Sequence, residues 1–145
     1  MKCAELIEPE KTAWTPHKQH VRIPTGLLGF EQIKDYHLTI RPGEEPFAWL
    51  NVEGNPALAF VVINPFIVVP DYQPDIPQAD VDLLQIESPD DAMLYSIVTI
   101  TNDPPTINLK GPIVINRHTY VGKQVILSNA GIFSVKHTLP VAGAI

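Results

Sequence analysis

The chain has 145 residues, with 10 basic and 16 acidic side chains and a formal net charge of −6 at pH 7. Hydrophobic residues make up 45% and charged residues 18%, which excludes an intrinsically disordered chain. Fifteen prolines, about twice the average usage of ~5%, exclude a helical bundle. The single cysteine excludes a disulfide framework, and the negative charge makes a nucleic-acid backbone a poor partner.

The length fits one domain over residues 1–145, because about 150 residues build a single core. Residues 1–17 are polar and interrupted by two prolines, so we expect a weakly ordered arm or an edge strand there. The longest uncharged stretch, residues 54–70, contains three further prolines and predicts buried sheet, not a membrane span. We expect a cytoplasmic protein without a signal segment, monomeric when free.

Prolines and glycines divide the sequence into short apolar segments of strand length. Residues 26–30 predict a tight loop, and residues 116–119 have the length of a hairpin loop. We interpret Pro65 as a bulge or a switch between sheets, after which the strand continues. Strands are predicted at residues 21–23, 36–40, 47–52, 58–63, 66–69, 92–101, 113–115, 120–127 and 133–138.

Helix signals are few. Pro77 is expected at the first position of a short helix with Val81 and Leu84 on its apolar side. Residues 88–91 carry a capping serine, a proline and two acids, which predict a single turn. The predicted fold is therefore all-β and mainly antiparallel, a closed or nearly closed β-barrel-like domain with one or two short helices on a connection.

The sequence contains no catalytic constellation. His17 and His20 are three residues apart, but no third ligand of matching spacing lies near them, so we expect neither a metal nor a cofactor. Acidic residues crowd one segment, where a solvated acidic face is the default interpretation; they are Asp71, Asp75, Asp80 and Asp82.

Amides near strand ends are the polar features that stand out. Asn108, Asn116 and Gln124 are interpreted either as turn locks or as hydrogen-bond donors to a partner, because a buried amide without partners costs about 1–3 kcal/mol. For each amide alone, turn locking is the better hypothesis. An aromatic set is interpreted as core side chains, not as a ligand pocket: Phe47, Trp49, Phe60, Phe66 and Tyr72.

Six sequence blocks occur together and cover positions 20 to 138. They are IPTGLLGFE at 23–31, PFAWL at 46–50, LAFVVINP at 58–65, IVTI at 97–100, NLKGPIVIN at 108–116 and GKQVIL at 122–127. In this order they resemble the FliW family of flagellar assembly factors. Leu28 stands where the family usually has a proline, Asn64 stands where it usually has an aspartate, and the first 17 residues match poorly.

The resemblance implies a non-enzymatic regulator that binds flagellin and, alternatively, CsrA, a small dimeric repressor of translation. Binding to CsrA would relieve repression of the flagellin message once flagellin is exported. A net charge of −6 suits a basic RNA-binding dimer. We expect partner contacts from an apolar anchor, an acidic rim and amide donors, namely Phe66, Asp71, Tyr72, Asn108, Asn116 and Gln124.

Two other classes of function remain open. A small-molecule carrier barrel would show a deep apolar cavity lined by Trp49 and Phe60. An enzyme, which ranks lowest, would show a concave site with two strongly perturbed carboxylates.

Overall fold

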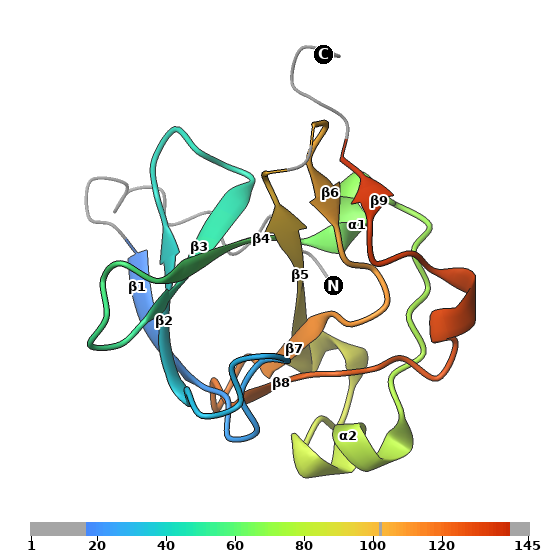
Figure 1. Cartoon of the computed structure of the whole chain (residues 1–145). Coiled ribbons are helices and arrows are strands. Elements are labelled where there is room, and N and C mark those ends of the chain that lie inside the picture. The colour runs from blue at the N-terminus through green and yellow to red at the C-terminus, as the bar shows by residue number, and fades with distance from the viewer. Residues whose placement is uncertain (1–16, 102, 140–145) are drawn as a thin grey trace.

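The computed structural model describes residues 17–101 and 103–139, and Figure 1 shows strands curving around an interior with short helices at the periphery. No helix in these ranges is long and apolar enough to cross a membrane. The elements are β1 (His17–Arg22), β2 (Asp35–Ile40), β3 (Phe47–Val52), β4 (Ala59–Ile63), α1 (Pro65–Val68), α2 (Gln78–Leu83), η2 (Pro89–Asp91), β5 (Ala92–Thr99), β6 (Thr106–Ile107), β7 (Ile113–Asn116), β8 (Gly122–Gln124), η3 (Ala130–Ile132) and β9 (His137–Thr138).

Every paired strand is antiparallel to its neighbour, which confirms the predicted all-β class. The strand order is β1-β2-β3-β4-β5-β6-β9, and β7 pairs with both β5 and β8. The sheet is not closed: at the end of β1, Arg22 forms only an isolated parallel bridge with Val121. The Arg22 N–H donates to the Tyr120 carbonyl at 3.0 Å there. Of the predicted arm at residues 1–17, residues 1–16 lie outside the described residues, and His17 begins the edge strand β1.

Strand β5 separates two hydrophobic cores. Its residues 92–95 pair with β7, whereas residues 96–99 pair with β4 and β6. Because side chains alternate along a strand, Met93, Tyr95 and Ile97 pack on one core while Leu94 and Val98 belong to the other. The first core lies inside the curved sheet and includes Val21, Ile23, Leu27, Tyr36, Leu38, Leu50, Val62 and Ile113. The second includes Ile63, Tyr72, Leu84, Ile107, Leu109, Val114, Val125 and Leu127.

The predicted strand at residues 66–69 is wrong, because a one-turn helix, α1, occupies this position. The Asn64 side chain accepts a hydrogen bond from the Phe66 N–H at 2.9 Å, and Pro65 stands in the first turn. An asparagine cap followed by proline is a helix start signal. Apolar side chains continuing after Pro65 hid that signal in the sequence.

Other elements agree with the prediction to varying degrees. Strand β3 has the predicted bounds, η2 forms at the predicted single turn, and α2 begins one residue after Pro77, which is its N-cap. The strand predicted at residues 133–138 shrinks to β9 (His137–Thr138), and β6 was not predicted. Asp80 departs from the expected solvated face, because it is buried and its carboxylate accepts a hydrogen bond from the Lys123 ammonium.

Candidate protein-binding surface

Three aromatic rings from separate segments form a continuous cluster beside α1. The ring centroids of Phe66 and Tyr72 lie 5.5 Å apart, and those of Tyr72 and Phe133 lie 5.0 Å apart. Tyr72 is only 4% exposed, and its hydroxyl donates to the Leu109 carbonyl at 2.7 Å. Burial raises the pKa of the Tyr72 phenol well above its ordinary value. Tyr72 is therefore an uncharged side chain, and the Phe66 ring packs on it.

The turn of α1 holds Phe66 and Ile67 toward solvent. Asn64 caps the helix start, and the Val69 N–H donates to the Pro65 carbonyl at 2.8 Å. The helix ends after this one turn because Val69 leaves the helical conformation. Pro65 is buried, whereas Phe66 is 38% and Ile67 is 53% exposed. The sequence therefore anchors this turn through its proline and leaves two large apolar side chains uncovered.

The segment around η3 is tied to the loop that follows α1. The Asn129 side chain donates to the Gln73 carbonyl at 2.9 Å and accepts from the Asp75 N–H at 3.0 Å. The Ser128 N–H also donates to the Asp75 carbonyl at 2.8 Å. These hydrogen bonds hold the η3 segment beside the loop that carries Tyr72, and Phe133, directly after η3, contacts the Tyr72 ring.

We call this region the apolar surface. It is the ring cluster of Phe66, Tyr72 and Phe133, together with the exposed apolar side chains that flank these rings in sequence, Ile67, Ile132 and Val135. Ile132 is 75% exposed and Val135 is half-exposed. The acidic side chain of Asp71, which precedes Tyr72, is exposed as well. Scattered apolar side chains are ordinary on a protein surface, but a group around one aromatic cluster is typical of a protein interaction site.

Two of the predicted amides hold loops together. The Asn108 side-chain oxygen accepts from the backbone N–H groups of Lys110 and Gly111, at 2.9 and 3.0 Å. Gln124 accepts from the Leu28 N–H at 2.9 Å and donates to the Gly111 carbonyl at 3.0 Å. These contacts favour the turn-locking interpretation over the donor interpretation for both residues.

Asn116 is almost fully buried and lies under α2. Its amide nitrogen donates to the carbonyls of Leu84 and Gln85, at 2.8 and 3.3 Å. Its oxygen accepts from the N–H groups of His118 and Thr119, at 2.8 and 3.3 Å. Both amide hydrogens are therefore used within the chain, and Asn116 locks the β7–β8 loop against the end of α2.

The structure thus brings three of the six predicted site residues together: Phe66, Asp71 and Tyr72. Asn108 lies just before Leu109, which accepts the Tyr72 hydrogen bond, and both Asn108 and Gln124 bond to the backbone of Gly111. Asn116 serves the separate loop between β7 and β8. Sequence reasoning missed Ile132, Phe133 and Val135, because alternating apolar residues there were interpreted as a strand. An Asn129 cap position ahead of Ala130–Ile132 was the available signal for a turn.

Trp49 and Phe60, the two side chains expected to line a carrier cavity, make other contacts in the structure. Trp49 lies on the outer side of β3, where its indole N–H donates to Glu44 at 2.8 Å and the Arg41 guanidinium lies 4.1 Å from its ring centroid. Phe60 packs on Phe30, at 5.0 Å between ring centroids. Trp49 is therefore not a core residue, contrary to the sequence interpretation.

A wide hollow of about 710 Å³ lies between α2, η2 and the β7–β8 loop. Its lining is largely polar and includes Asp82, Glu87, Asp91 and His118. Hydrogen bonds from His118 at 2.9 Å and from the backbone of Glu87 hold the pKa of Asp91 below its usual range. A general acid needs a raised carboxyl pKa, so Asp91 does not have the pKa shift that a general acid requires.

Comparison with known proteins gives one consistent result. The family model described as "FliW protein" matches residues 10–139. The chain is 42% identical over 125 residues to "Flagellar assembly factor FliW" of Geobacillus thermodenitrificans, covering 84% of this chain and 85% of that protein. It is 36% identical over 124 residues to the protein of the same name from Treponema denticola, covering 84% and 83%.

A solved structure shares the fold as well. The chain superimposes on "Crystal structure of the flagellar assembly factor FliW" with a TM-score of 0.75 and 40% sequence identity. The match covers 85% of this chain and 86% of that chain.

Proposed function

The chain belongs to the FliW family of flagellar assembly factors, and from this premise we propose that it binds flagellin and CsrA as alternative partners. It acts by surface complementarity and transforms no substrate. Capture of CsrA releases translation of the flagellin message, so free flagellin and flagellin synthesis are coupled. This role belongs in the cytoplasm, where the message is translated.

The apolar surface is the observation that carries the proposal. Phe66 and Ile67 stand out from a helix whose proline is buried, and Ile132 is three-quarters exposed. An aromatic side chain that already packs against a buried aromatic ring loses little conformational entropy on binding. This is typical of anchor residues in interfaces. We assign Phe66 as the apolar anchor, Tyr72 as its support, and Asp71 as part of the acidic rim.

Alternative binding requires overlapping footprints or different preferred conformations. An ordinary interface covers about 800 Å² of each partner, and the total accessible surface of the chain is 8480 Å². The surface of the chain is therefore large enough for two separate footprints. The small size of the chain alone would not prevent flagellin and CsrA from binding at the same time. We propose that both partners use the apolar surface.

The test is a competition between the two partners, with the chain's own flagellin and CsrA. Purified chain forms a complex with each, and increasing flagellin displaces CsrA in size-exclusion chromatography with multi-angle light scattering. Phe66→Asp weakens both complexes by about tenfold or more, because a charge replaces an apolar anchor that each partner would cover. The matched control is Leu83→Asp, since Leu83 is 60% exposed on α2, which lies away from α1 in Figure 1.

A stable complex of all three proteins would contradict alternative binding. Equal weakening by Phe66→Asp and Leu83→Asp would instead show that the apolar surface is not the binding site, although the competition itself stood. Circular dichroism of both variants verifies that the fold is retained.

A further inference from the structure

Two histidines and two carboxylates gather on the outer face of the sheet, away from the apolar surface. His20 in β1 is directly opposite His37 in β2 in the antiparallel register. Asp35 lies two residues before His37 and shares its face, because side chains alternate along a strand. Glu53 follows the end of β3, where its N–H donates to the Asp35 carbonyl at 3.1 Å. Residues far apart in sequence thus meet at one point.

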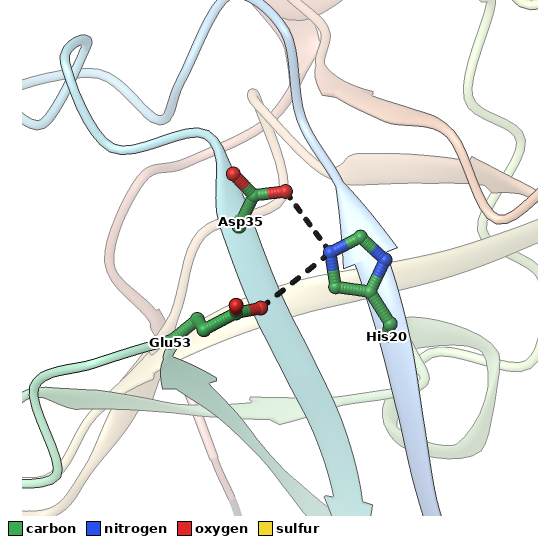
Figure 2. A group of neighbouring side chains, drawn as sticks. All are labelled: His20, Asp35 and Glu53. Atoms are coloured by element: carbon green, nitrogen blue, oxygen red, sulfur yellow. Dashed lines mark hydrogen bonds and ion pairs between the residues drawn. The ribbon is translucent and has the colours of Figure 1, made fainter.

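The distances within this group fit a shared metal ion. The Nε2 atom of His20 lies 3.0 Å from an Asp35 carboxylate oxygen and 3.7 Å from a Glu53 oxygen (Figure 2). Ligand atoms of these three residues all lie within 4.8 Å of one another. His37 Nε2 lies 3.3 Å from the same Glu53 oxygen. Two ligands of a tetrahedral ion, each at about 2.0–2.1 Å from it, are separated by about 3–3.5 Å.

The ligand types select the class of metal. Imidazole nitrogens combined with carboxylate oxygens suit zinc and similar divalent transition metals, whereas calcium and magnesium prefer oxygen alone. His20, Asp35 and Glu53 are each about half-exposed, and His37 is more buried. An ion would therefore reach the site from solvent and exchange readily.

One neighbouring group opposes a cation. A guanidinium nitrogen of Arg22 lies 3.7 Å from the Asp35 carboxylate oxygen. Arg22 is directly opposite Asp35 in the register, and its half-exposed side chain is able to turn into solvent. Removing the Arg22 charge is expected to strengthen metal binding. An Arg22 variant should therefore change the affinity in the opposite direction to variants that remove a metal ligand.

We propose that His20, Asp35 and Glu53 form an exchangeable zinc site that joins β1 to β2 and the end of β3, with His37 beside it as a neighbour of Glu53. Sequence reasoning expected no metal because it looked for a third ligand near His17 and His20 along the chain. The partners come instead from neighbouring strands. The site is independent of the proposed partners, so its failure leaves the regulatory function untouched.

The test is titration of the full 145-residue chain with Zn²⁺ by isothermal titration calorimetry, after treatment with a chelator and its removal. One equivalent of zinc binds, and His20→Gln and Glu53→Gln each weaken binding at least about tenfold. Arg22→Gln strengthens it. Co²⁺ bound in place of zinc gives the visible absorption of a tetrahedral ion, which disappears in His20→Gln.

Two matched controls separate this site from other zinc ligands of the chain. His118→Gln removes another exposed histidine that contacts a carboxylate, at 2.9 Å from Asp91, and Cys3→Ser removes the single thiol. Neither changes the affinity. No measurable binding, or a loss in either control that equals the loss in His20→Gln, overturns the proposal, and unchanged thermal unfolding of the metal-free variants shows that they remain folded.

Discussion

At the scale of single residues, Asn116 shows how one buried amide organises two elements. Its four hydrogen bonds connect the end of α2 to the loop between β7 and β8. Each of those backbone groups needs a partner, because a buried polar group without one costs free energy. The same amide that looked available for a partner is thus committed to the fold.

We expect Asn116→Ala to lower the free energy of unfolding by about 1–3 kcal/mol, because it leaves buried backbone groups without partners. Urea denaturation followed by circular dichroism measures the loss. The matched control is Asn55→Ala, since Asn55 is exposed and its side chain accepts one hydrogen bond, from the Ala57 N–H at 3.3 Å. Equal losses in the two variants would contradict the assigned role.

At the scale of elements, the loop between β1 and β2 depends on a close backbone approach. Gly26 has φ +71°, and a Cβ atom there would lie 2.5 Å from the Glu31 Cα atom and 2.6 Å from its carbonyl oxygen. The approach lets Leu27, next in sequence, reach the first core while Leu28 stays exposed. Gly29 has φ +90° but has open space where its Cβ would be.

The two glycines make a matched pair for measurement. Gly29→Ala is expected to cost about 1 kcal/mol, from the positive φ alone. Gly26→Ala adds a backbone clash that nothing flexible relieves, and we expect a further 1–3 kcal/mol or so. The difference between the urea midpoints of Gly26→Ala and Gly29→Ala measures the cost of the backbone clash alone. Similar midpoints would show that the loop moves to relieve the clash.

The strands were the most predictable elements, and the short turns the least. Alternation of apolar side chains gave β3 its bounds and located β2, β4 and β5 to within a few residues, because one face of each strand is buried. The one-turn helices α1 and η3 are too short to show a helical period. The asparagine at each N-cap position was the remaining signal, and the neighbouring apolar residues outweighed it.

The candidate sites were predictable only in part, for a related reason. Phe66, Asp71 and Tyr72 are close in sequence, so local reasoning grouped them. Phe133 joins the same cluster from a distant segment, and His20 meets Glu53 only through the register of three strands. Such contacts depend on strand order, which local sequence patterns do not specify.

At the scale of the whole molecule, the acidic charge bears on how fast partners meet. The net charge of −6 creates a long-range field that attracts a basic partner. The apolar surface supplies short-range contacts that are not subject to charge screening by salt. The net charge therefore acts mainly on the association rate constant, and the apolar surface acts mainly on the dissociation rate constant.

We expect the association rate constant with CsrA to fall by about tenfold when the salt concentration rises from about 0.05 to 0.5 M, because the Debye length shortens. The dissociation rate constant changes little. Stopped-flow fluorescence measures both, and Asp71→Asn serves as a single-charge comparison that slows association only slightly. An association rate independent of salt would contradict electrostatic steering.

The position of β5 between the two cores has a consequence for how this sequence tolerates insertion and deletion. Neighbouring side chains of β5 belong to opposite cores, so one added or removed residue inverts every later side chain of the strand. Met93 would then point into the core that Leu94 now fills, and Leu94 into the core that Met93 now contacts. Side-chain packing would be disrupted in both cores at once. A one-residue insertion within Ala92–Thr99 is therefore expected to destabilise the fold more than the same insertion in a connecting loop.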